Sequence, residues 1–534
     1  NATGSYNTFV GFEAGTGGET SAPYSSGQNN TALGYEALTA FTTAGETTAV
    51  GYQAGSAITT GIRNVTVGAY SGDSLTTGTR NVAIGTHTLG TATTANLNVA
   101  IGQGAMESAA AGVAFEGAIA IGKDALTAIN STDANGTIAI GYQAGTAITS
   151  GLKNIAIGYQ ALYTATANDY NTAIGYTALY SISGSDGTEG EANTALGYRA
   201  GYSTTTGNFN TFLGRDTGYY NTTGDANVII GASSGQENTI GSNNIYIGYQ
   251  AALYQKAKGE NIAIGTGGLY GANNEASSTE ASVAIGFQAA RGSSAGVGLT
   301  AVGRGALRNV SDSGSYSVAV GYNSAYYATG SYNTFVGANA GTGGTTSAPY
   351  SSGEKNVAMG YQALTGFTTA ERVVAIGYNA GASLTTGGQS VFIGYNAGDA
   401  IIDGYRNIAI GDNALSEDAG DDNIAIGLFA LKDLSGASVN IGIGTRAGET
   451  ITTGTRNIAI GWRTMWDLNA GSNSADSEEN IFIGYSAGGG TWADVRSDHN
   501  VAIGNFSMDA ALNGANYNTA LGNYTLSSLT TGDS

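Results

Sequence analysis

The stretch Asn81-Val82-Ala83-Ile84-Gly85 decides the fold, because variants of this five-residue word recur along the chain. The first copy is Asn7-Thr8-Phe9-Val10-Gly11, and the last is Asn518-Thr519-Ala520-Leu521-Gly522. The word occurs 29 times, and 16 of the 28 intervals between its closing glycines have the same length as that from Gly68 to Gly85. Since most of the other intervals are longer, we expect a constant coil with loops of variable length inserted into it.

The columns of the word predict a short strand between two corners. The second position is Thr, Val or Ile in all 29 copies and the fourth is always aliphatic or Met; both share one face of a strand, which we expect to fill the coil interior. The third position is Ala in 20 copies, so we expect an outer face packed against other chains. Asn in 21 first positions and Gly in every fifth favour corners, because both tolerate left-handed backbone.

The spacing of the words predicts the architecture. The residue three after each closing glycine is small, a Thr-Thr-Gly turn often follows, and no ten-residue helical pattern intervenes. Short strands at this period predict an all-β fold, a parallel β-solenoid (β-roll) of about 29 coils with a modal 17-residue repeat, in which like residues stack in ladders. We expect residues 1–534 to form one continuous β-solenoid.

A second, longer period is superimposed on the first. Residues 1–208 resemble 327–534 in part, at an offset of 326, and both prolines, Pro23 and Pro349, occupy the same inserted loop of this longer pattern. Because the chain starts and stops inside the pattern, we expect the parent protein to be longer.

Composition excludes several classes of protein. The chain has no Cys, so it has no disulfide framework, thiolate metal site or cysteine nucleophile. Its net charge of −20 and lack of a basic cluster disfavour nucleic acid and anionic membrane surfaces as partners. Apolar runs are too short for membrane insertion. An apolar content of 41% with only 11% charged residues predicts a folded chain.

Tyrosine is the side chain that most suggests a binding surface. It follows the closing glycine in 12 of 29 coils, and equivalent positions of consecutive coils form a column with a spacing of about 4.8 Å. Rings at that spacing can stack on one another, pack between chains or contact a ligand such as a glycan. The candidate binding residues are Tyr35, Tyr52, Tyr142, Tyr159, Tyr176, Tyr361, Tyr378 and Tyr395.

We expect neither a catalytic residue nor a resident metal or cofactor. His87 and His499 are far apart, whereas a triad or zinc site needs several convergent groups. The Gly-x-x-Gly strings lack the following helix of a phosphate-binding loop. Acidic inserts could bind Ca²⁺ or simply be solvated loops. They contain Asp186, Glu189 and Glu191; Glu417, Asp418, Asp421 and Asp422; and Asp476, Glu478 and Glu479.

The repeated word resembles the head repeat of trimeric autotransporter adhesins, and it is similar to coils of phage tail fibres and other bacterial surface fibres. Asn64-Val65-Thr66-Val67-Gly68 and Asn457-Ile458-Ala459-Ile460-Gly461 are typical instances, and the resemblance extends from Asn7 to Gly522. It implies a left-handed parallel β-roll assembled as a homotrimer. The coils are longer than is common in that family, and the sequence shows neither a membrane-anchor pattern nor a heptad stalk.

We therefore expect a non-catalytic structural or adhesive fibre: an adhesin head, tail fibre or surface filament on a cell or virion. The expected partners are further copies of the chain, in a homotrimer or filament, and a cell-surface glycan or protein receptor. One alternative is a β-helical polysaccharide-binding or polysaccharide-degrading protein, and degradation would need paired carboxylates at a local break in the repeat. A further alternative is an ice-binding solenoid, which would need a flat Thr-x-Thr array.

Overall fold

The computed structural model describes residues 2–18, 24–184, 188–271, 279–293, 296–310, 315–346, 350–468 and 472–532. Pro23, Pro349 and Asp186 lie outside these residues. The chain forms two compact units, Asn1–Thr266 with Asn273–Ser277, and Gly267–Ala272 with Ser278–Ser534.

Each strand consists of positions two to four of one word. The first unit contains β1 (Thr8–Val10), β2 (Thr31–Leu33), β3 (Thr48–Val50), β4 (Val65–Val67), β5 (Val82–Ile84), β6 (Val99–Ile101), β7 (Ile119–Ile121), the 3-10 turn η1 (Thr132–Ala134), β8 (Ile138–Ile140), β9 (Ile155–Ile157), β10 (Thr172–Ile174), β11 (Thr194–Leu196), β12 (Thr211–Leu213), β13 (Val228–Ile230), β14 (Ile245–Ile247) and β15 (Ile262–Ile264).

The second unit repeats the same plan. It contains β16 (Val283–Ile285), β17 (Thr300–Val302), β18 (Val318–Val320), β19 (Thr334–Val336), β20 (Val357–Met359), β21 (Val374–Ile376), β22 (Val391–Ile393), β23 (Ile408–Ile410), β24 (Ile424–Ile426), β25 (Ile441–Ile443), β26 (Ile458–Ile460), the short helix α1 (Ser472–Ala475), β27 (Ile481–Ile483), β28 (Val501–Ile503) and β29 (Thr519–Leu521).

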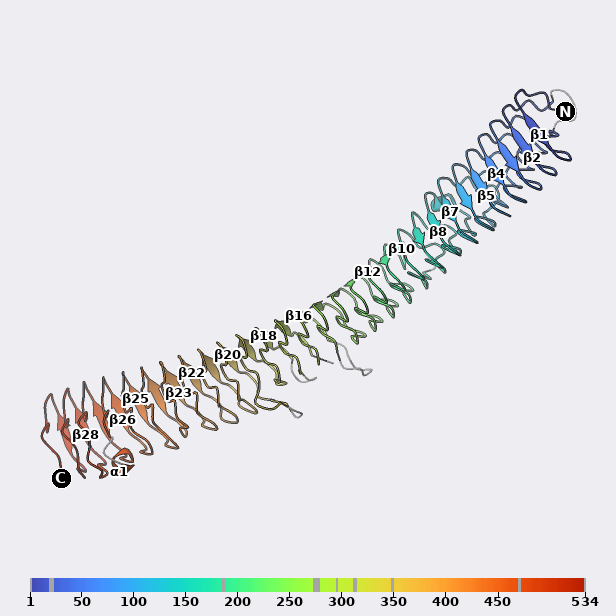
Figure 1. The fold of residues 1–534 in the computed structure, drawn as a ribbon. Helices are drawn as coiled ribbons and strands as arrows, with labels where there is room; N and C mark the ends of the chain where they lie inside the picture. Colours follow the sequence, from blue (N-terminus) through green and yellow to red (C-terminus); the bar gives the residue numbers. More distant parts are fainter. Residues whose placement is uncertain are drawn as a thin grey trace. The chain divides into compact units, whose positions relative to one another are not determined.

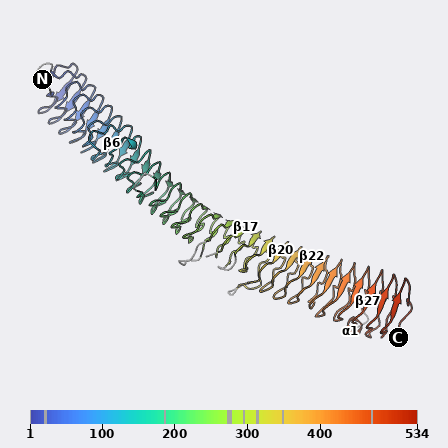
Figure 2. The same ribbon diagram turned by 180° about the vertical axis from the view of Figure 1, so that it is seen from behind.

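Within each unit, consecutive strands pair in parallel and in register, so their arrows follow one another in Figures 1 and 2. Between β5 and β6, for example, Ala83 faces Ala100 and Ile84 faces Ile101. The turns are laddered as well: the N–H of Thr59 donates to the carbonyl of Thr76, at the equivalent position of the next coil. The expected all-β parallel β-solenoid, with its short in-register strands at a nearly constant spacing, is confirmed.

The closing glycine of the word is required by both conformation and space. Gly51 has a φ of 138° and Gly158 one of 136°, a region that side chains disfavour. A Cβ on Gly51 would lie 2.5 Å from the carbonyl oxygen of Gly68 in the next coil. Each corner therefore stacks glycine on glycine, and this explains why the fifth position is invariant.

The expectation for the inside and outside of the coil is wrong. The third position is buried in nearly every strand, while the second and fourth are partly or largely exposed. Ala83 and Ala409 are fully buried, whereas Ile84 is 38% exposed. So short a coil is too narrow to enclose two columns of branched side chains and instead encloses the Ala column with residues of its other segments, such as Leu38, Ala54 and Ile58.

Large residues at the third position are accommodated by glycine. Phe392 replaces Ala in β22, and a Cβ on Gly398 of the same coil would lie 2.4 Å from its ring. A Cβ on Gly381 of the preceding coil would lie 2.7 Å from the same ring. The buried Phe ring thus fills the space that two missing side chains leave, which keeps the interior close-packed.

The word's first-position Asn has a different role from the one expected. Asn81 is fully buried, and the left-handed conformation belongs to the residue before it, Arg80, with a φ of 58°. The backbone N–H of Asn81 donates to Oδ1 of Asn64 over 2.9 Å, and its Nδ2 donates to the carbonyl of Ala95 over 2.7 Å. These asparagines therefore form an internal ladder that joins successive coils.

Residues 326 apart make the same contacts in the two units. Phe9 and Phe41 have ring centroids 5.6 Å apart, and Phe335 and Phe367 have theirs 5.5 Å apart, with an interplanar angle of 50° in both pairs. Nδ2 of Asn333 donates to the carbonyls of Gly330 and Gly353, as the corresponding atom of Asn7 does to those of Gly4 and Gly27.

Candidate functional surfaces

The tyrosines that follow the closing glycines form stacked outer columns. Tyr35 and Tyr52 have ring centroids 5.1 Å apart at an interplanar angle of 6°. In the same unit, Tyr142, Tyr159 and Tyr176 stack in series at 5.1 and 5.0 Å. The second unit contains the column Tyr361, Tyr378 and Tyr395, with spacings of 5.3 and 5.1 Å.

The eight candidate tyrosines thus lie in three separate columns, and each ring is 38 to 50% exposed. Within a column, neighbouring rings cover one another's faces. An inner ring such as Tyr159 therefore presents its edge and hydroxyl to solvent, while an open face remains only where a column ends. A ligand on these columns would meet hydroxyl groups and ring edges rather than a row of stacking platforms.

Sequence reasoning missed a second tyrosine column, five residues after the closing glycine. Tyr163, Tyr180, Tyr202 and Tyr219 stack with centroid distances of 5.0 Å at each step. The signal was present in the constant spacing from Gly158, Gly175, Gly197 and Gly214. This column is not evident from the alternation of residues in the strand, because that alternation cannot be extended through the bend at each closing glycine.

A groove of about 270 Å³ lies between the two tyrosine columns of the first unit. Thr177 and Arg199 lie between the columns, and the Arg199 guanidinium is 4.9 Å from the ring centroid of Tyr198 and 4.8 Å from that of Tyr219. Nε of Arg199 also lies 2.7 Å from Oδ1 of Asp216, whose side chain is 8% exposed. Arg199 is therefore paired with a neighbouring carboxylate, which Nε of Arg215 also approaches to 3.7 Å.

The pKa values of three column tyrosines, Tyr35, Tyr52 and Tyr180, are raised. A hydrogen bond with Glu36 raises the pKa of Tyr35, and the negative charge of that carboxylate adds to the effect. Burial raises the pKa of Tyr52 and of Tyr180, and their tyrosine neighbours raise it further. These three tyrosines therefore offer hydroxyl groups that can donate and accept hydrogen bonds.

The outward face of the sheet is a second candidate surface. It is formed by the second and fourth positions of the words, which are Val, Ile, Leu or Met except for Thr at nine second positions. Fourth-position side chains are among the most exposed apolar groups of the molecule, including Leu33 at 48%, Leu196 at 46% and Met359 at 42%. We call the outward second and fourth positions of β1–β29 the aliphatic sheet face.

Threonines of the Thr-Thr-Gly turns, and of Thr-Thr-Ala turns at equivalent positions, form a further column. The hydroxyl of Thr42 donates to the carbonyl of Thr59, and that of Thr59 to the carbonyl of Thr76, over 3.1 and 3.2 Å. The first threonine of each pair thus bonds within the solenoid, while the second, such as Thr60 or Thr77, is exposed.

Four carboxylates of the acidic inserts, those of Asp421, Asp422, Glu478 and Glu479, are engaged with arginines. Arg406 binds Asp422 at 2.6 Å, and this hydrogen bond lowers the pKa of that carboxyl. Arg456 lies 2.8 Å from Glu479, and Arg496 lowers the pKa of Glu478. Among the described residues, no group of three or more His, Asp or Glu could hold a metal ion.

No protein-family model matches the chain, and no curated protein matches it. In the part of the chain that the structure describes, no helix is long and apolar enough to cross a membrane. A β-solenoid of repeated coils is compatible with a structural or fibre role, so function is inferred from the surfaces described above.

Proposed function

We propose that the chain is a non-catalytic structural or adhesive fibre whose copies associate through the aliphatic sheet face. The observation that carries this proposal is the exposure of branched apolar side chains along every strand of both units. A soluble monomer rarely leaves a contiguous apolar patch of more than a few hundred Å² open.

The size of the face fits a second copy of the chain. Fifteen strands in the first unit, at about 4.8 Å per strand and about 10 Å of strand length, give roughly 700 Å² of face. A standard stable interface buries about 800 Å² on each partner. A partner with the same repeat can match this face coil by coil, whereas a compact globular partner would cover only a short part of it.

The repeat pattern supports a homotrimer on a cell or virion surface as the form of this assembly. The resemblance of the word to adhesin-head and fibre repeats favours three chains and an extracellular location. The inward Ala column leaves the aliphatic side chains free to meet other chains. Tyrosine columns at the edge of that face would then remain available to a receptor or glycan.

The test replaces four exposed residues of the aliphatic sheet face together: Ile84→Glu, Ile264→Glu, Ile285→Glu and Ile503→Glu. Each side chain is 36 to 38% exposed, so the coils should fold while four like charges per chain oppose close approach. We expect the oligomeric mass measured by light scattering to fall to that of a monomer, with β-structure retained in circular dichroism.

The matched control places the same four charges on the exposed threonine column: Thr60→Glu, Thr77→Glu, Thr369→Glu and Thr386→Glu. This variant should keep the mass of the unmodified protein. A stable monomer of the unmodified protein at micromolar concentration, or equal loss of mass in both variants, would refute association through the sheet face.

A further inference from the structure

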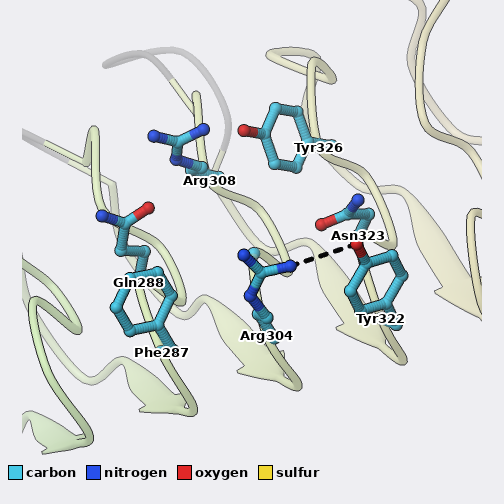
Figure 3. A pocket seen from close by; sticks show the side chains of 8 residues that line it. Phe287, Gln288, Arg304, Arg308, Tyr322, Asn323 and Tyr326 are labelled. Carbon is cyan, nitrogen blue, oxygen red and sulfur yellow. Dashed lines mark hydrogen bonds between the residues drawn. The ribbon is translucent and has the colours of Figure 1, made fainter.

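The second unit contains a hollow where the outer aromatic columns are interrupted by arginines (Figure 3). Phe287, Arg304 and Tyr322 each follow the closing glycine of consecutive coils. The Arg304 guanidinium lies 5.5 Å from the ring centroid of Phe287 and 5.6 Å from that of Tyr322. Its Nη1 also donates to the Tyr322 hydroxyl over 3.1 Å, so the two neighbouring rings hold this guanidinium in place.

The column five residues after the glycines shows the same pattern. It runs through Tyr270, Arg291, Arg308 and Tyr326. The Arg291 guanidinium lies 5.1 Å from the ring centroid of Tyr270, and that of Arg308 lies 5.1 Å from that of Tyr326. Arg291, Arg304 and Arg308 thus lie together on the two columns. Their separations along the sequence are irregular and become regular only when each arginine is counted from the closing glycine of its coil, so the cluster was not predicted from the sequence.

Gly305 opens the space between the two columns. The corresponding residues of the adjacent coils are Gln288 and Asn323, both with left-handed backbone at φ 55° and 51°. Because Gly305 has no side chain, the Asn323 amide and the Tyr326 ring can approach its backbone, where a Cβ would lie 2.6 Å from Oδ1 of Asn323. A cavity of about 190 Å³ remains between Arg304 and Arg308, with the amide side chains of Gln288 and Asn323 also lining it. This volume is below the usual range for a drug-sized ligand and suits one small polar group.

The charge of the hollow is not balanced by the described residues. Within them, no carboxylate forms a salt bridge with Arg291, Arg304 or Arg308, whereas Arg199 in the first unit pairs with Asp216. Between Ala281 and Gly353 the sequence has three arginines and one acidic residue, Asp312, which lies outside the described residues. This excess of positive charge occurs in a chain of net charge −20.

Arg308, which lines the hollow, has an unsatisfied donor. Its Nε is buried and has no hydrogen-bond partner among the described residues, and a buried donor without a partner is costly. A planar oxyanion is the group that guanidinium forks bind best, through paired charge-assisted hydrogen bonds. The amides of Gln288 and Asn323 and the Tyr326 hydroxyl can in addition bond the hydroxyl groups of a sugar.

We propose that this hollow binds a carboxylate-bearing saccharide, such as one uronic acid unit of an acidic glycan. Arg304 and Arg308 bind the carboxylate, and the two amides contact the ring hydroxyls. The site lies on the aromatic columns rather than on the aliphatic sheet face, so it does not rest on the proposed self-association.

The experiment titrates the full chain with glucuronate at low ionic strength and follows binding by calorimetry and ligand-detected NMR. Glucose, acetate and inorganic phosphate are titrated in parallel. We expect glucuronate to bind more tightly than all three, because only it offers both a carboxylate and ring hydroxyls. Equal affinity for acetate or glucose, tighter binding of phosphate, or no binding of glucuronate would overturn the proposal.

Two kinds of variant locate the site. Arg304→Ala should weaken glucuronate binding by about tenfold or more, since it removes a charge-assisted hydrogen bond. Gly305→Asn keeps all three arginines but fills the hollow and displaces the Asn323 amide, since a Cβ at Gly305 would lie 2.6 Å from Oδ1 of Asn323. Asn323 shows that Asn tolerates this left-handed backbone, and the variant should abolish binding.

The matched control is Arg372→Ala, which removes the same charge from a half-exposed side chain beside Glu371 in the same unit. Its affinity for glucuronate should be that of the unmodified protein, and all variants should retain the circular dichroism spectrum. Equal weakening by Arg372→Ala and Arg304→Ala would show attraction by overall charge alone and would overturn the site.

Discussion

At the residue scale, the buried third position of the word limits what the coil can contain. Ala83 is fully enclosed, while Ile84 beside it is 38% exposed. The interior near Ala83 contains alanine methyl groups, aliphatic side chains and a few hydroxyl groups, such as that of Ser71, which donates to the Ala83 carbonyl over 2.8 Å; it provides no positive charge to neutralise a carboxylate. Where the third side chain is large, as in Phe392, glycines around its ring provide the volume.

Ala83→Asp should therefore destabilise its coil by about 3 kcal/mol or more, because it buries a carboxylate that no positive charge neutralises. Ile84→Asp should cost far less, since that carboxylate reaches water. Thermal unfolding midpoints and resistance to protease compare the two variants. A larger loss for Ile84→Asp than for Ala83→Asp would contradict the assignment of inside and outside.

At the element scale, each three-residue strand is also stabilised by hydrogen bonds of the residue that precedes it. The first-position asparagines link coils: Oδ1 of Asn440 accepts the backbone N–H of Asn457 over 2.9 Å, and Nδ2 of Asn440 donates to the carbonyl of Gly454 over 3.0 Å. Asn440 is fully buried. Where serine replaces asparagine, as at Ser390, its hydroxyl still accepts the N–H of Asn407 over 3.1 Å.

Asn440→Ala should destabilise the region around β25 and β26 by about 1 to 3 kcal/mol, because the Asn457 N–H and the Gly454 carbonyl lose buried partners. Asn440→Ser should recover part of the loss, as Ser390 does naturally. Hydrogen exchange of the Asn457 amide measures the effect at the site itself. Equal stability of the Ala and Ser variants would show that the hydroxyl does not replace the ladder bond.

The sequence was sufficient to predict the strands and their stacking, because the word, its glycine and the constant spacing of its copies are all local signals. It was not sufficient to assign the faces: alternation shows that Val82 and Ile84 share a side, but only the width of the coil decides which side is inside. The Tyr163 column and the hollow at Gly305 arise after the bend at the closing glycine, where strand periodicity carries no information.

At the scale of the whole molecule, the proposed association of chains depends on two opposing forces. Each chain has a net charge of −20, so copies repel one another over the Debye length, about 30 Å at 0.01 M salt and about 3 Å at 1 M. The aliphatic sheet face favours association, because the burial of apolar surface is favourable and does not depend on charge. The balance between them should therefore depend on ionic strength.

We expect the fraction of associated chains, measured by light scattering at fixed protein concentration, to rise as salt is raised from about 0.01 M to about 1 M at neutral pH. Lowering the pH toward the isoelectric point near 4.3 should act in the same direction, because it removes the same repulsion. The fourfold Ile→Glu variant of the sheet face is the control, and it should remain monomeric over the salt series at neutral pH. Dissociation of the unmodified protein by salt would instead mean that ion pairs hold the chains together, and contact through the aliphatic sheet face would then be wrong.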